Sequence, residues 1–199
     1  IKGVSLTGSD KAGASIAKVA GENIKKSVLE LGGTDPMIIL NDADLEKVMA
    51  GTINGRLRNA GQACTSSKRI NVQEEIYDEY LAKVTAYVQN MKVGNPMEDD
   101  TDMGPLSSKN AMETLLDQIN QSIEQGAQLV VGGKQIGNEG SFLEPTILTD
   151  LKPGMKAYDE EVFGPVVCLI KVKTIDEALT IANDTIYGIG ASIYTENIE

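Results

Sequence analysis

The sequence of 199 residues contains no histidine, no tryptophan and only two cysteines. Without histidine, neither a Cys-His nor a Ser-His-Asp arrangement can form within the chain. The two thiols, Cys64 and Cys168, are far apart in sequence, which is not the pattern of a disulfide framework and offers no cluster of zinc ligands. Any general base in this chain must therefore be a carboxylate, a lysine or a tyrosine. We expect no metal site and a reducing, cytoplasmic location.

Positive charge is also scarce, with 18 Lys and Arg residues against 29 Asp and Glu residues, a net charge of −11. This balance disfavours nonspecific binding to nucleic acids or to anionic membranes. No apolar run reaches the roughly 18 residues that a membrane span needs. The chain starts with Ile1-Lys2-Gly3-Val4, which resembles the middle of a strand. We therefore expect a piece of a longer protein.

Short apolar runs typical of strands alternate with segments of helical periodicity. Strands are predicted at residues 4–7, 28–31, 37–40, 69–73, 129–131, 142–148, 166–172 and 189–194, and helices at residues 10–20, 45–59, 75–90, 107–125 and 175–183. This order predicts an α/β fold with a mainly parallel sheet flanked by helices. Gly32, Gly33 and Pro36 form the weakest join, where a hinge between two domains can lie.

Cys64 is the first candidate for chemistry. It follows the end of a predicted helix at Asn59-Ala60-Gly61, where glycine suits a left-handed turn, and small polar residues surround it. Such a place can expose a sulfur, and a thiol acts through its thiolate. The alternative is a small buried side chain in a loop. Cys168 lies inside an apolar strand, where packing explains it.

Glu30 is the second candidate, because it interrupts the apolar strand Val28–Leu31 just before two glycines. The carboxyl end of a strand in an α/β fold faces the crevice where ligands bind. Partial burial there would suit a general base. The alternative is a side chain that simply alternates outward on a half-exposed strand.

Two further segments could bind a cofactor. Gly8 and Ser9 follow a strand and begin a helix, whose N-terminal N–H groups bind phosphate well, although plain helix capping also explains them. Glu161 and Phe163 lie in Glu160-Glu161-Val162-Phe163-Gly164-Pro165, where a carboxylate could hold ribose hydroxyls and a ring could pack on a heterocycle. An ordinary acidic loop with a core phenylalanine is the alternative.

Taken together, these segments resemble the aldehyde dehydrogenase superfamily in order and spacing over essentially the whole chain. The resemblance rests on Glu30-Leu31-Gly32-Gly33-Thr34-Asp35-Pro36, Gly61-Gln62-Ala63-Cys64, and Glu160-Glu161-Val162-Phe163-Gly164-Pro165-Val166. Leu6-Thr7-Gly8-Ser9 is also similar to the segment before the first of these motifs. Lys68-Arg69 and Leu40-Asn41-Asp42-Ala43-Asp44 look most like the NAD(P)-dependent succinate-semialdehyde dehydrogenases.

The resemblance implies a role for each candidate residue. Cys64 would be the nucleophile that forms a thiohemiacetal and then a thioester with an aldehyde, and Glu30 would activate the water that hydrolyses the thioester. Glu161 would hold the nicotinamide ribose of NAD or NADP, Phe163 would pack near the nicotinamide, and Gly8-Ser9 would meet the pyrophosphate. No metal is implied.

The resemblance also implies an organisation. Residues 1–33 would be the C-terminal tail of the dinucleotide-binding domain, and residues 34–199 most of the catalytic domain, truncated at its C-terminus. The second oxyanion donor would lie upstream of Ile1, and loss of one donor typically costs about 10²–10³ in rate. We therefore expect little or no activity from these 199 residues alone. The complete enzyme would be a homodimer or homotetramer acting on a small aldehyde.

Two other functions fit the same residues. The first is a noncatalytic α/β module whose thiol is inert. The second is a reductase of acyl phosphates or acyl-CoA, which uses the same thioester in the reverse direction. The retained acid at position 30 favours hydrolysis, because a water-activating base is a liability in acyl-CoA chemistry.

Overall fold

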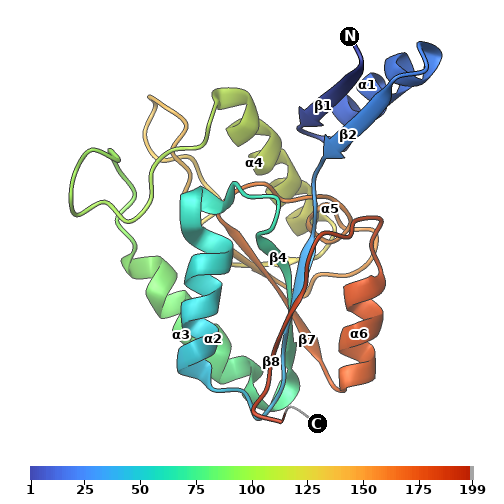
Figure 1. The fold of residues 1–199 in the computed structure, drawn as a ribbon. Coiled ribbons are helices and arrows are strands. Elements are labelled where there is room, and N and C mark those ends of the chain that lie inside the picture. Colours follow the sequence, from blue (N-terminus) through green and yellow to red (C-terminus); the bar gives the residue numbers. More distant parts are fainter. Residues whose placement is uncertain (198–199) are drawn as a thin grey trace. The chain divides into compact units, whose positions relative to one another are not determined.

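The computed structural model describes residues 1–197. The chain divides into two compact units, an N-terminal unit, Ile1–Gly33, and a large unit, Thr34–Glu199 (Figure 1). Each unit has its own sheet, so each is described by itself.

The N-terminal unit is a single strand–helix–strand element. Strand β1 (Gly3–Thr7) and strand β2 (Lys26–Glu30) pair in parallel, and helix α1 (Asp10–Glu22) connects them. The Ser9 hydroxyl accepts a hydrogen bond from the Ala12 N–H at 3.3 Å and caps the helix, as its position in the sequence predicts. The register places Thr7 opposite Glu30, so both strands end at the same edge.

The large unit contains a six-stranded sheet in the order β5-β6-β7-β4-β3-β8. Its strands are β3 (Asp35–Ile39), β4 (Ser67–Gln73), β5 (Gln128–Val131), β6 (Thr146–Thr149), β7 (Val166–Val172) and β8 (Ser192–Tyr194). Every pairing is parallel except that of β5 with β6. The predicted α/β fold with a mainly parallel sheet is therefore confirmed.

Helices cover both faces of this sheet, as a parallel sheet requires. They are α2 (Leu45–Thr52), α3 (Glu74–Asn90), α4 (Lys109–Glu124), the short α5 (Lys156–Asp159) and α6 (Ile175–Asn183). Successive residues of β7 enter opposite layers of the core: Val166, Cys168 and Ile170 pack with α4, α5 and α6, whereas Val167 and Leu169 pack with α2 and α3. Figure 1 shows α2 and α3 together on one side of the sheet and α6 on the other.

The helix predicted over residues 45–59 is wrong in its second half. The α-helix ends at Thr52, a π-helical turn, η1, covers Ile53–Leu57, and a 3₁₀ turn, η2, covers Arg58–Gly61. Tertiary contacts of Arg56, described below, replace the regular helix here. A π-turn inside a helix often marks a functional site.

Two other predictions need correction, and one short helix was missed. The extended segment 142–148 forms a strand only from Thr146, because Pro145 has no N–H for a ladder. The predicted strand 189–194 begins at Ser192, because the Gly190 N–H is bonded to the Asp35 carboxylate instead, at 3.1 Å. Helix α5 was not predicted, since four residues are too few to show a period.

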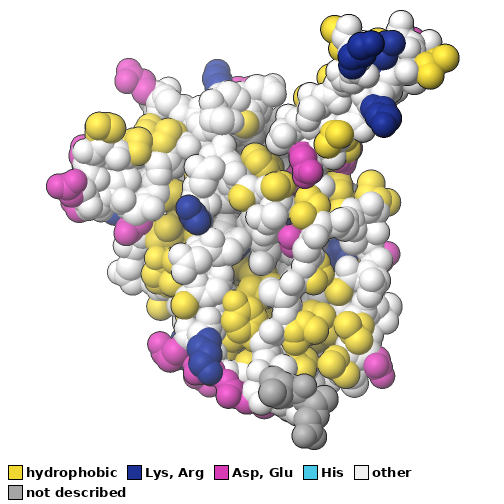
Figure 2. Space-filling model, viewed as in Figure 1, with side chains coloured by type: hydrophobic (Ala, Val, Ile, Leu, Met, Phe, Trp, Pro, Cys, Tyr) yellow, Lys and Arg dark blue, Asp and Glu magenta, His cyan; other side chains and the backbone are white. Residues whose placement is uncertain are grey.

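Figure 2 shows hydrophobic side chains gathered over the edge strand β8 and along helix α6, where Ile175, Leu179 and Ile193 are exposed. Among residues 1–197, no helix is both long enough and apolar enough to cross a membrane. In the same residues, no three acidic or thiol side chains are grouped to hold a metal ion.

Candidate active site

Cys64 lies in the loop of residues 62–66 that joins η2 to β4, here called the Cys64 loop. The chain enters this loop through three consecutive left-handed residues, Asn59, Ala60 and Gly61, with φ angles of 55°, 53° and 69°. The predicted left-handed conformation of Gly61 is thus confirmed. A Cβ atom at this position would overlap the backbone carbonyl of Gly164, so only glycine fits.

A buried arginine joins the Cys64 loop to the segment of residues 160–165, here called the Glu161 segment. The Arg56 side chain is fully buried and donates five hydrogen bonds. The acceptors are the carbonyls of Gly61, Val162, Gly164 and Val166 and the hydroxyl of Ser66. Burial lowers the pKa of Arg56 to about 10, so the guanidinium stays charged at neutral pH. Its bonds hold the two segments side by side.

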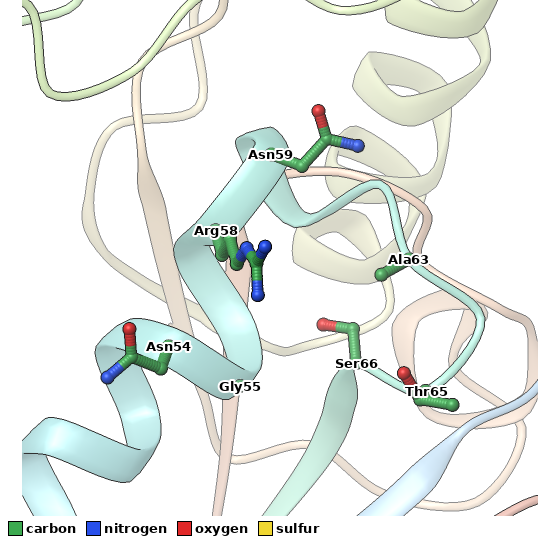
Figure 3. A pocket seen from close by; sticks show the side chains of 7 residues that line it. All are labelled: Asn54, Gly55, Arg58, Asn59, Ala63, Thr65 and Ser66. Atoms are coloured by element: carbon green, nitrogen blue, oxygen red, sulfur yellow. The ribbon is translucent and has the colours of Figure 1, made fainter.

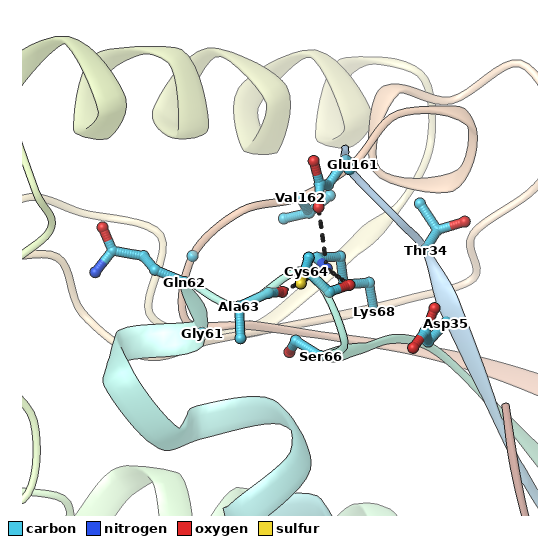
Figure 4. Close-up of polar contacts among 12 residues, drawn as sticks. Thr34, Asp35, Gly61, Gln62, Ala63, Cys64, Ser66, Lys68, Glu161 and Val162 are labelled. Carbon is cyan, nitrogen blue, oxygen red and sulfur yellow. Dashed lines mark hydrogen bonds and ion pairs between the residues drawn. The ribbon is translucent and has the colours of Figure 1, made fainter. Parts of the chain in front are cut away.

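A second buried cation lies between the same segments. The Lys68 side chain, only 1% exposed, forms an ion pair with the Glu161 carboxylate at 3.1 Å. Its ammonium also donates to the carbonyls of Ala63 and Cys64, at 2.7 and 3.0 Å (Figure 4). The Phe163 ring centroid lies 5.7 Å from Lys68 Nζ. The structure therefore brings Cys64, Glu161 and Phe163 together around one lysine.

The groups that a substrate would meet are accessible. The Cys64 residue is half-buried rather than enclosed. Within residues 1–197, nothing accepts a hydrogen bond from its backbone N–H, which can therefore bind an oxyanion. Phe163 is 42% exposed, and the Glu161 side chain is 18% exposed. The exposure of Phe163 contradicts the alternative of a core phenylalanine.

The other predicted residues lie in the N-terminal unit. Glu30 ends β2, and its carbonyl accepts a hydrogen bond from the Gly8 N–H at 3.0 Å, beside the Ser9 cap of α1. These three residues therefore share the carboxyl edge of the parallel pair. Glu30 is exposed, so the expected partial burial is not found there. The meeting of Glu30 with Cys64, which belong to different units, stays a prediction.

The model of the aldehyde dehydrogenase family matches residues 1–199. The chain belongs to the aldehyde dehydrogenase family.

Several relatives extend beyond this chain. The succinate-semialdehyde dehydrogenase [NADP(+)] of Deinococcus radiodurans is 43% identical over 199 residues, which are all of this chain and 42% of the relative. The crystal structure of succinic semialdehyde dehydrogenase from Streptococcus pyogenes with NADP+ is 46% identical, with a TM-score of 0.94 over 98% of this chain and 43% of that one. The crystal structure of betaine aldehyde dehydrogenase from Staphylococcus aureus with NAD+ is 37% identical. It superimposes with a TM-score of 0.96 and covers 100% of this chain and 40% of that chain. The chain thus spans about two fifths of these relatives.

In this member of the aldehyde dehydrogenase family, the structure places at the candidate site two buried cations, Arg56 and Lys68, that its sequence did not single out. Arg56 could have been noticed as a cation within the apolar stripe of a predicted helix, and Lys68 as a cation at the start of an apolar strand. Arg56 binds carbonyls as far as 110 positions away, and Lys68 pairs with Glu161 on a distant segment, so no local pattern contains these contacts.

A polar pocket of about 610 Å³ adjoins the Cys64 loop. Its lining residues are Asn54, Gly55, Arg58, Asn59, Ala63, Thr65 and Ser66. Figure 3 shows the Arg58 side chain across the pocket from the Ala63–Ser66 segment. Within residues 1–197, Arg58 forms no ion pair and no side-chain hydrogen bond. Its guanidinium is therefore available to an anionic ligand in this pocket beside the Cys64 loop.

We expect the two thiols to differ strongly in alkylation by iodoacetamide at neutral pH. Cys168 is 1% exposed, and burial raises its pKa to about 11, so about one thiol in 10⁴ is ionised at neutral pH. The labelling rate of Cys168 should therefore rise about tenfold per pH unit up to about pH 11. Cys64 should react at least about 100-fold faster at neutral pH. Peptide mass spectrometry after timed labelling measures both rates.

The unfolded chain is the control, because there both thiols should react at similar rates. Equal and slow labelling of the two thiols in the native protein would contradict an activated Cys64 and favour the inert module.

Proposed function

We propose that this chain carries the nucleophile and part of the cofactor site of an NAD(P)-dependent aldehyde dehydrogenase whose substrate is succinate semialdehyde. Residues 1–33 are then the tail of the dinucleotide-binding domain, and residues 34–199 are most of the catalytic domain. The observation that carries the proposal is the grouping of Cys64, Glu161 and Phe163 around Lys68.

The residues present fit the cofactor. A partly exposed carboxylate, Glu161, lies beside a solvent-facing ring, Phe163, and the two suit a ribose and a flat heterocycle. The N-terminus of α1 at Ser9 suits a phosphate group. When bound, NAD(P)+ would be the hydride acceptor that allows the Cys64 adduct to be oxidised to a thioester.

The reaction of this chain begins with the Cys64 thiolate, which adds to the aldehyde carbon and forms the C–S bond of a thiohemiacetal. The Cys64 backbone N–H stabilises the negative oxygen of this adduct. After oxidation, Glu30 takes a proton from water, whose oxygen attacks the thioester carbon. The C–S bond then breaks, which returns the Cys64 thiolate and releases the carboxylic acid.

Arg58 favours a substrate with a second, negatively charged end. A guanidinium binds a carboxylate through charge-assisted hydrogen bonds, and the pocket that contains Arg58 adjoins the Cys64 loop. Two of the relatives are named for succinate semialdehyde, which has a carboxylate at the end opposite the aldehyde.

A panel of aldehydes, followed by NAD(P)H absorbance, tests the proposal in a catalytically competent polypeptide that contains this sequence. Succinate semialdehyde should give the highest kcat/KM. No oxidation of any aldehyde would contradict the proposal. Thioester transfer to coenzyme A in preference to water would favour the acyl-CoA reductase instead.

We expect Arg58→Met to raise the KM for succinate semialdehyde about 10- to 100-fold, because a hydrogen bond to a charged group contributes about 1.5–3 kcal/mol. Butanal, which has the same carbon chain without the carboxylate, is the control substrate. Its kcat/KM should change less than about twofold. An equal loss for both substrates would show that Arg58 does not recognise the carboxylate.

A further inference from the structure

We propose that Lys68 is a positioning residue that holds the Glu161 carboxylate and the Cys64 loop in their working geometry. This inference rests on the proposed function. It concerns a residue in the large unit that touches neither the aldehyde nor the reacting sulfur in the mechanism above.

All of the hydrogen-bonding capacity of the Lys68 ammonium is used within the site. An ammonium group has three N–H donors. Lys68 directs them to the carbonyl of Ala63, the carbonyl of Cys64 and the carboxylate of Glu161, at 2.7, 3.0 and 3.1 Å. Two of these acceptors lie on the Cys64 loop and one on the Glu161 segment, so a single charged group ties the nucleophile to the ribose-binding acid (Figure 4).

A buried lysine at this position would destabilise the folded protein unless nearby groups compensate its charge. The side chain is 1% exposed, and burial lowers the pKa of Lys68, while the charge of Glu161 opposes that change. The buried Asp35 carboxylate at the start of β3 also favours the charged form, and Arg56 opposes it. Replacement of a buried ion pair by apolar side chains is often neutral for stability. Stability alone therefore does not explain the lysine.

Lys68 also contacts the ring of Phe163. Its ammonium lies 5.7 Å from the ring centroid, within the range of a cation–π contact. The ring itself is 42% exposed and is not held by the core. Lys68 therefore contacts both Glu161 and Phe163, the side chains assigned to the nicotinamide half of the cofactor.

The test compares Lys68→Met, Glu161→Gln and the double variant in a catalytically competent polypeptide that contains this sequence. Lys68→Met should raise the KM for NAD(P)+ at least about tenfold, with a smaller change in the KM for the aldehyde. If Lys68 acts through Glu161, adding Lys68→Met to Glu161→Gln should change the cofactor KM by less than about twofold.

A second variant separates the two contacts of Lys68. Lys68→Gln keeps an N–H donor for the carbonyls of the Cys64 loop but removes the charge. It should weaken cofactor binding as Lys68→Met does, yet leave the alkylation rate of Cys64 within about threefold of the wild type, whereas Lys68→Met should lower that rate further.

Lys171→Met is the matched control. Lys171, on the neighbouring strand β7, also forms an ion pair with Asp78 and a cation–π contact with Tyr77. Unlike Lys68, it lies at the surface. It should leave the kinetics unchanged. A Lys68→Met variant that folds and keeps the wild-type cofactor KM and Cys64 reactivity would overturn the proposal. So would one that does not fold, since Lys68 would then be a structural residue. An inactive wild type would instead refute the proposed function.

Discussion

Cys64→Ser should lower kcat for aldehyde oxidation by about 10⁴-fold or more in a catalytically competent polypeptide that contains this sequence. A serine hydroxyl at neutral pH is a far weaker nucleophile than a thiolate, and no histidine in this chain can activate it. The change is one atom in size, and the Arg56 and Lys68 bonds to the surrounding backbone remain. Cofactor affinity should therefore stay within about twofold, which fluorescence titration measures alongside the steady-state rate.

Cys168→Ala is the control for this experiment. Cys168 is buried in β7 and contacts the core, so its replacement should cost about 1–2 kcal/mol of stability and leave the rate per folded molecule unchanged. A Cys64→Ser variant that keeps a tenth or more of the wild-type activity would rule out Cys64 as the nucleophile.

In the Glu30→Gln variant, formation of the thioester should stay fast and its hydrolysis should become slow. If Glu30 activates the hydrolytic water, its amide variant forms the thioester but does not release it, and the steady-state rate should fall about 10²–10⁴-fold. Stopped-flow absorbance should then show a burst of about one NAD(P)H per active site. Intact-protein mass spectrometry should detect the acyl group, and peptide mapping should place it on Cys64.

Glu22→Gln, at the exposed end of α1 in the same unit, is the control and should behave as the wild type. A Glu30→Gln variant that turns over at the wild-type rate would contradict the role of Glu30. A variant that loses the burst as well would place Glu30 before hydride transfer rather than in hydrolysis.

Elements with a strong local signal were predicted well. The run Val166–Val172 is apolar at nearly every position, and both faces of β7 are buried. Ser9 caps α1 through a hydrogen bond from the Ala12 N–H, as the capping interpretation of Gly8 and Ser9 expects. In each case the determining interaction lies within a few residues, so the sequence contains it.

The predictions failed where distant groups determine the backbone. The helix predicted over residues 45–59 gives way after Thr52 to a π-turn, and Asn59 and Ala60 are left-handed, while Arg56 binds carbonyls on the Glu161 segment. The same applies at Gly190, whose N–H is bonded to Asp35 rather than to a neighbouring strand. A hydrogen bond across more than 100 positions leaves no trace in a local pattern.

The amino-acid sequence alone was enough for the family and the α/β fold, because motif spacing and periodicity are properties of the chain itself. It also proposed Cys64 as the nucleophile, a role that the predicted variants test. It also singled out Glu161 and Phe163. The fold was needed to show that Lys68 and Arg56 join their segment to the Cys64 loop. Buried cations that bind backbone carbonyls are selected by three-dimensional proximity and by the cost of burying charge, and neither can be read from residue order.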